Sequence, residues 1–202
     1  TRNPDVLEAD LPRSAFDSGL RRCKKGKATP DGIPAELFQA LEECADDLFM
    51  QIQHMWREEN VPHAMLVVVF LTFYKGIKKG SPDDFANYRP LALYTHAAKV
   101  VGAILDACIA EETELSRPLT QAGFESDMAA RNNILRLQMA IDRALGLGYS
   151  MVVGLSDYAG AFDGTSHKAD DAALKKRGAS RKTRAMLRAV NAGTTGRVRL
   201  RQ

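Results

Sequence analysis

The sequence has no long hydrophobic segment and no N-terminal signal. Its longest apolar run, residues 64–73, is interrupted only by Thr72. That run is too short for a bilayer-spanning helix, which needs about 20 apolar residues. The first residues, TRNPDVLEADLPRS, lack the basic start and apolar centre of a signal peptide. Because the sequence begins with Thr1 rather than Met, it indicates a fragment or a processed chain. We therefore expect an intracellular protein with no membrane association.

Cysteine is also scarce. Cys23, Cys44 and Cys108 are the three cysteines of the chain. Their spacing does not match a zinc site, and their odd number does not make a complete set of disulfides. These features exclude a disulfide-stapled scaffold and predict buried or inert thiols in a reducing compartment.

The charges are unevenly distributed. The net charge is +3, and of the 28 Lys and Arg residues ten lie in residues 172–202, which contain no Asp or Glu. A second basic cluster, RRCKKGK, occupies residues 21–27. Such clusters attract phosphate backbones, although a solvated helix face has the same composition. Charge alone leaves both interpretations open.

Hydrophobic periodicity predicts an α+β fold, rich in helices with a short antiparallel sheet. We expect a polar N-terminal segment with a short helix and a loop or hairpin at 75–90, where Gly and Pro recur. Helices are predicted at 35–59, 96–114, 129–146, 166–177 and 180–191. Buried strands are predicted at 65–74 and 149–155, and the final GRVRLRQ has the alternation of a strand.

Asp157 is the first candidate for a functional residue. It follows the predicted strand at 149–155, and a carboxylate just past a buried strand is a common position for a metal or phosphate ligand. By itself, an Asp at this position is more often a helix cap or a turn residue.

The segment VVGLSDYAGAFDGTSHKADDAALKKRGAS, residues 152–180, resembles the first palm motif of reverse transcriptases from non-LTR (LINE-type) retrotransposons. In that motif a strand ends in Asp, followed by Ala-Phe-Asp and by Ser-His before a helix. Four upstream segments resemble other parts of the same family, in the same order. They are residues 24–41, 55–65, 73–105 and 119–142.

The resemblance implies a reverse-transcriptase fold, with a polar lead-in at 1–20, fingers at 21–148 and a partial palm at 149–202. It also implies synthesis of DNA on an RNA template, with a DNA primer and deoxynucleoside triphosphates (dNTPs) as substrates. In the full-length protein, two Mg²⁺ ions would be held by palm carboxylates. No protein partner is predicted.

The same resemblance assigns roles to five residues. Asp157 would be the first metal ligand, with the carbonyl of Tyr158 assisting. Phe162 would lie under the sugar and exclude a 2′-hydroxyl, and Lys75 and Arg89 would contact the triphosphate of the incoming nucleotide. Other roles stay open: Arg89 could pair with Asp83 or Asp84, and Phe162 could be a core residue.

The second carboxylate pair of the family, aromatic-x-Asp-Asp, does not follow Asp157 in this chain. The Asp pairs at 46–47, 83–84 and 170–171 occur in a helix, a turn and a helix, and none is expected to bind the catalytic metals. We therefore expect the isolated chain not to polymerise DNA, and to expose apolar surface meant for missing strands.

Two alternatives remain. One is a non-catalytic RNA-binding remnant of a decayed element. The other comes from FDGTSH, residues 162–167, which is similar to the Asp-x-Asp-Gly-Thr motif of haloacid-dehalogenase-like phosphatases. In this chain Ala161 occupies the position of their nucleophile.

Overall fold

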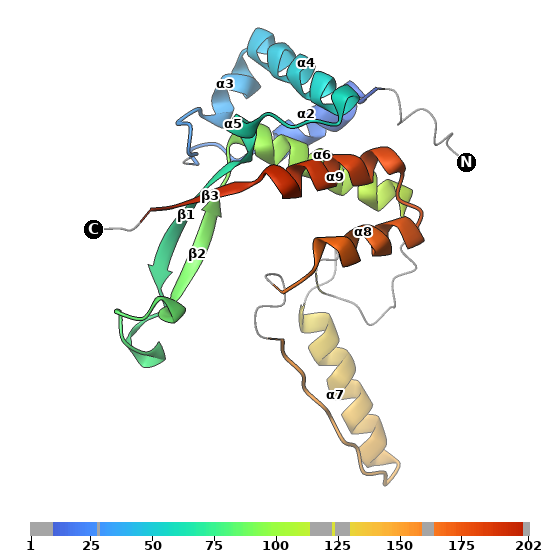
Figure 1. The fold of residues 1–202 in the computed structure, drawn as a ribbon. Coiled ribbons are helices and arrows are strands. Elements are labelled where there is room, and N and C mark those ends of the chain that lie inside the picture. Colours follow the sequence, from blue (N-terminus) through green and yellow to red (C-terminus); the bar gives the residue numbers. More distant parts are fainter. Residues whose placement is uncertain (1–9, 28, 114–122, 124–129, 159–163, 200–202) are drawn as a thin grey trace. The chain divides into compact units, whose positions relative to one another are not determined.

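The computed structural model describes residues 10–27, 29–113, 123, 130–158 and 164–199. The chain divides into two compact units: unit 1 spans Thr1–Glu114 and Ser166–Gln202, and unit 2 spans Leu115–Thr165. The described residues form helices and one small mixed sheet (Figure 1), which agrees with the predicted α+β class. The division into lead-in, fingers and partial palm, with boundaries after residues 20 and 148, stays a prediction. No helix among the described residues is both long and apolar enough to span a membrane.

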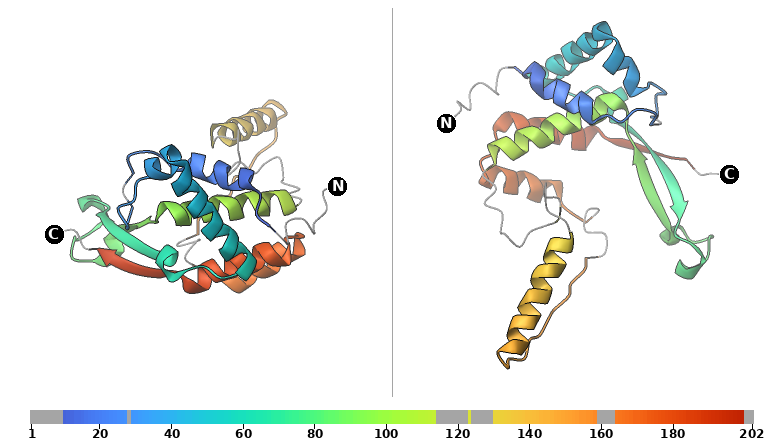
Figure 2. Two further views of the ribbon diagram at one scale, coloured as in Figure 1. Left: turned by 90° about the horizontal axis from the view of Figure 1, so that it is seen from above. Right: turned by 180° about the vertical axis from the view of Figure 1, so that it is seen from behind.

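Unit 1 is built mainly from helices that bury one face each. Phe16, Trp56, Ile104 and Met186 come from four different helices, and each is at most 2% exposed. The α-helices among the described residues of unit 1 are α2 (Arg13–Arg22), α3 (Ala35–Ala40), α4 (Glu42–Glu58), α5 (His63–Leu66), α6 (His96–Glu112), α8 (His167–Lys176) and α9 (Arg181–Gly193). The backbones of α2 and α6 approach closely beside Gly19, where a Cβ atom would lie 3.2 Å from the Val100 carbonyl oxygen (Figure 2).

Most helix positions in unit 1 agree with the periodicity, with one interruption. The predicted helix at 35–59 is divided into α3 and α4 at Leu41, whose φ of −110° and ψ of 107° are extended. Neither Pro nor Gly marks this position in the sequence. The break lets the two segments bury different faces: α3 buries Ala35, whereas α4 buries a full stripe that ends at Trp56.

The sheet has three strands in the order β2-β1-β3. The strands β1 (Val67–Tyr74) and β2 (Tyr88–Leu93) pair in antiparallel fashion as a hairpin, and β3 (Thr195–Arg199) pairs with β1 in parallel. The predicted short antiparallel sheet is therefore confirmed for β1 and β2, whereas β3 adds a parallel pairing that was not predicted. Its cause lies in tertiary structure, because the chain returns to the sheet through α9 and enters β3 in the direction of β1.

The predicted buried strand at 65–74 is confirmed as β1, but it is less buried than expected. Val68 is 1% exposed, whereas Phe73 is 45% exposed. Residues 65 and 66 belong instead to α5. The strand leaves the helical core toward its end (Figure 1), so its later residues have fewer neighbours to cover them.

The N-terminal end of α9 is fixed by two carboxylates. Glu112 accepts hydrogen bonds from the Ser180 backbone N–H (2.8 Å) and from the Thr183 hydroxyl (2.9 Å). Glu59 accepts two hydrogen bonds from the Arg181 guanidinium, at 3.1 and 2.6 Å, and this pairing lowers the pKa of Glu59. These contacts hold α9, and with it the start of β3, in place.

Unit 2 contains the helix α7 (Ala130–Gly146), which buries none of its residues. Two residues after the helix lies Gly148, whose φ of +74° is in the left-handed region that suits glycine after a helix. The predicted buried strand at 149–155 is wrong: these residues form no strand, and Val152 and Leu155 are 95% and 93% exposed. The backbone of a strand needs a neighbouring strand for its hydrogen bonds. Among the described residues, none pairs with this segment.

Candidate functional site

The hairpin of β1 and β2 brings Lys75 and Arg89 to the same end of the sheet. Arg89 pairs with Phe73, and Tyr88 pairs with Tyr74. The ladder continues one residue further, since the Lys75 backbone N–H donates to the Asn87 carbonyl over 2.8 Å. Sequence reasoning assigned Lys75 and Arg89 to one binding role, and the structure places Lys75 directly after β1 and Arg89 on β2.

The connection between the strands, residues 75–87, is held by its own side chains. The Tyr88 hydroxyl donates to the Pro82 carbonyl (2.9 Å), and the Asn87 side-chain amide donates to the Ser81 carbonyl (2.9 Å). The rings of Tyr74 and Tyr88 lie with centroids 5.5 Å apart. The predicted loop or hairpin is confirmed, and its backbone is well anchored.

The side chains of Lys75 and Arg89 differ in their contacts within the fold. The Lys75 ammonium donates to the Ala86 carbonyl at 2.6 Å, inside the connection. Arg89 is exposed, and its side chain makes no hydrogen bond or ion pair with the other described residues. Its expected alternative partners are engaged in the turn: Asp83 accepts from the Ser81 hydroxyl and Asp84 accepts from the Ala86 backbone N–H. Of the two cations, Arg89 is therefore the one that can meet a ligand without breaking a contact.

Arg89 belongs to a sheet face that carries positive charge and exposed apolar surface. Residues paired across strands project from the same face, and alternate residues of one strand share it. By this register Phe73, Arg89, Leu91 and Arg197 lie on one face, which we call the basic sheet face. Phe73 and Leu91 are 45% and 50% exposed. Arg197 pairs with Val69, four residues before Phe73, which corresponds to roughly 13 Å along the strand.

Sequence reasoning did not assign Arg197 a role. The available signal was the alternation of GRVRLRQ, which predicts a strand but does not show which strand it joins. Once β3 is placed beside β1, Arg197 shares a face with Arg89. A planar guanidinium suits phosphate oxygens, and an exposed aromatic ring offers a surface for stacking a base. The face thus has the chemistry of a nucleic-acid or nucleotide contact.

The predicted metal residues lie in unit 2. Asp157 and Tyr158 belong to the exposed segment after α7, and Tyr158 is 78% exposed. Phe162 falls outside the described residues. Within the residues that the structure describes, no three His, Cys, Asp or Glu side chains gather as metal ligands. A lone carboxylate does not fit two Mg²⁺ ions, each of which needs several oxygen ligands.

At least one member of each Asp pair makes a structural contact. Asp46 accepts from Arg13 in α2, and Asp83 and Asp84 serve the turn described above. Asp171, in the third pair, lies in the first half of α8. It is half-buried and pairs with Arg184 at 3.4 Å and with Arg188 at 3.6 Å, because α9 packs beside α8.

Comparison with known proteins returned no match: no family model fits the sequence, and no curated protein is similar to it at a significant level.

Proposed function

We propose that this chain is part of an RNA-directed DNA polymerase of the non-LTR retrotransposon type, and that its basic sheet face binds phosphate groups. The proposal is supported by the five family-like segments in family-like order. It is supported further by the exposed Arg89 beside Phe73, on a hairpin formed by the segment that resembles the polymerase fingers. The exposed Arg89 is the observation that carries the proposal.

In the full-length polymerase, bound Mg²⁺ would activate the primer hydroxyl and neutralise charge on the triphosphate. Asp157 would supply one oxygen ligand for it, with the Tyr158 carbonyl assisting. Phe162 would select deoxyribose, while Lys75 and Arg89 would orient the triphosphate. The chain alone has one of the required carboxylates, so we propose that it binds nucleic acid without extending a primer.

A non-catalytic RNA-binding remnant is the second candidate function. The observation that favours it is the combination of the exposed basic sheet face with a lone carboxylate at Asp157. Both functions require phosphate binding. Only the polymerase is expected to bind more tightly when a primer and a matched deoxynucleotide are present.

The first test is salt-dependent binding of fluorescently labelled RNA, measured by anisotropy from about 50 to 200 mM salt. We expect Arg89→Ala to weaken binding several-fold. We also expect the slope of the logarithm of the binding constant against the logarithm of the salt concentration to fall by about one, as for the loss of one phosphate contact. The matched control is Arg143→Ala, which removes an exposed arginine from α7. If the unmodified chain does not bind RNA at low salt, the proposal is rejected. If both variants lose affinity equally, the basic sheet face is not the RNA-binding surface.

The second test separates the two candidates. An RNA template annealed to a DNA primer is titrated with the protein and Mg²⁺, with or without the template-matched dNTP. Tighter binding with the matched deoxynucleotide, but not with the ribonucleotide, supports the polymerase. Equal binding of RNA regardless of primer and nucleotide supports the remnant.

A further inference from the structure

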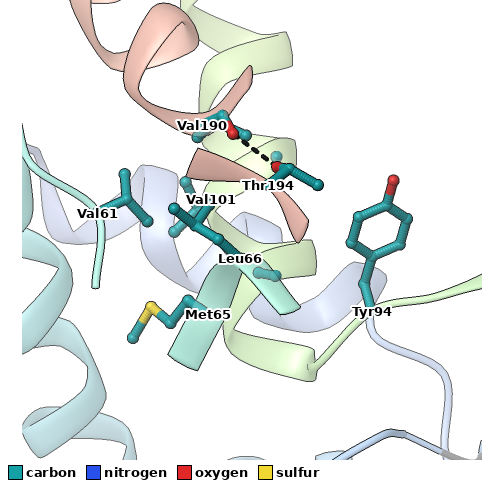
Figure 3. Close-up of a pocket in the computed structure, with 9 residues that line it drawn as sticks. Val61, Met65, Leu66, Tyr94, Val101, Val190 and Thr194 are labelled. Carbon is teal, nitrogen blue, oxygen red and sulfur yellow. Dashed lines mark hydrogen bonds between the residues drawn. The ribbon is translucent and has the colours of Figure 1, made fainter. Parts of the chain in front are cut away.

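A separate pocket of about 270 Å³ lies in unit 1, at the point where all three strands meet the helices (Figure 3). Leu66 lines it directly before β1, Tyr94 lines it directly after β2, and Thr194 lines it directly before β3. Val101 and Gly102 of α6 form another wall. The pocket therefore touches the base of every strand that carries the basic sheet face.

The lining of this pocket carries no formal charge. Its side chains are aliphatic apart from Met65, Tyr94 and Thr194, and the Thr194 hydroxyl already donates to the Val190 carbonyl over 2.6 Å. A charged ligand would lose its hydration here without gaining an opposite charge, which is costly. The Tyr94 hydroxyl, on a side chain that is 40% exposed, remains for one polar contact at the rim. The pocket suits a neutral and mostly apolar ligand.

Gly102 lies in the wall of the pocket and is exposed. A glycine inside a helix costs about 1 kcal/mol relative to alanine, so it needs a compensating reason. At Gly193 that reason is packing, since a Cβ there would collide with the Leu66 side chain. At Gly102 a Cβ would meet no atom within 4 Å. Packing against the described residues does not require this glycine, and a larger side chain at this position would enter open space at the pocket wall.

We infer that the pocket binds a neutral, mainly apolar small molecule with one hydrogen-bonding group, which meets the Tyr94 hydroxyl. The uncharged lining selects the class of ligand, and a large side chain at position 102 would occupy part of the space for it. Binding stabilises the base of the sheet, because a ligand that binds only the folded state adds to the free energy of unfolding. The pocket is formed by unit 1 whether or not the protein belongs to a polymerase.

The test uses the neutral fluorescent probe 1-aminoanthracene with the full chain. We expect a saturable increase in fluorescence at one probe per chain. Gly102→Leu fills the wall of the pocket and weakens this binding about tenfold or more. Gly102→Ala adds one methyl group. This variant should still bind the probe, and its thermal stability should rise. Ala98→Leu, one helical turn earlier, fills the same space if the first variant does not fold.

The control variant is Leu145→Gln in α7, which removes an exposed apolar side chain (65% exposed) from unit 2. It leaves the saturable binding unchanged if the probe occupies the pocket. Two results overturn the inference: a folded Gly102→Leu or Ala98→Leu variant that binds like the original chain, or binding by the original chain that does not saturate at one site. Loss of binding in Leu145→Gln overturns it as well, since the probe then reports exposed apolar surface.

Discussion

The two units of this chain use similar apolar sequences with different results. In unit 1, Trp56 and Ile104 are 2% and 1% exposed, whereas in unit 2 Val152 and Leu155 are 95% and 93% exposed. Both units contain an amphipathic helix and a β-branched apolar segment. Unit 1 has several helices that cover one another and a strand with partners on both sides. Unit 2, as far as the structure describes it, has one helix and one unpaired segment.

The two units show that an apolar segment needs a partner segment before it can form a buried strand. The segments 65–74 and 149–155 are both rich in apolar residues, valine among them, and both were predicted as buried strands. Only the first forms a strand, since β2 and β3 supply hydrogen bonds on its two edges. An apolar pattern therefore predicts the tendency to be buried, while the partner decides whether burial occurs. The expected exposure of apolar surface is found, and it is greatest in unit 2.

The largest expected effect is from Trp56→Ala. Trp56 is among the largest fully buried side chains of unit 1, and removal of such a ring costs about 3–5 kcal/mol of unfolding free energy. The matched change in unit 2, Leu155→Ala, is expected to alter stability by less than about 0.5 kcal/mol. Urea denaturation followed by circular dichroism measures both. Comparable losses would mean that Leu155 is covered in solution, and the contrast between the units would fail.

An intermediate effect is expected from Glu112→Ala in α6. The change leaves the Ser180 N–H and the Thr183 hydroxyl without their carboxylate acceptor, and Thr183 is fully buried. Unsatisfied buried groups of this kind cost about 1–3 kcal/mol. Glu43→Ala, at an exposed position of α4, is the control and should change stability little. If the two variants melt at the same temperature, Glu112 does not anchor α9.

The smallest expected effect is the pH dependence of unit 1 stability. His96 is 1% exposed, and burial, followed by the charge of Lys99, lowers its pKa. The folded protein therefore disfavours the imidazolium, while the unfolded chain binds a proton at the ordinary pKa of about 6.5. The stability due to neutral His96 is complete above that pH and decreases below it, by at most roughly 1.4 kcal/mol per pH unit.

This dependence is measured as the urea midpoint at about pH 7.5 and about pH 5.5, on either side of the ordinary histidine pKa. His96→Gln should flatten the difference between the two midpoints. His167→Gln, at the exposed start of α8, should leave it unchanged. An unaltered difference in His96→Gln would assign the pH dependence to other groups.

Much of the local structure could be predicted from the sequence. The helices near 96–112, 130–146, 167–176 and 181–193 were expected within a few residues, because their apolar spacing is helical, and two of them begin at a capping residue. Thr95 and Ser180 accept hydrogen bonds from backbone N–H groups three residues further on, as helix caps do. Cys23 and Cys108 are buried, and burial raises the pKa of Cys108 to about 11, as expected for inert thiols.

The candidate site was predictable only in part. Lys75 and Arg89 could be placed on one hairpin because the strands are close in sequence and joined by a turn-rich segment. The contribution of Arg197 could not be predicted, since it arrives from more than 100 residues away on a strand whose partner the sequence does not specify. The roles of Asp157, Tyr158 and Phe162 rest on the family resemblance and stay predictions.

The sequence alone determined the elements whose causes are local: helical periodicity, N-caps, the glycine after α7, and a β-branched hairpin. Tertiary structure decided the parallel pairing of β3, the exposure of residues 149–155, the ion pairs of Asp171 and the pocket beside Gly102. The physical reason is the same in each case. Hydrogen bonds along a strand edge, charge pairs and cavities depend on a second segment, and its position is set by the packing of the whole chain.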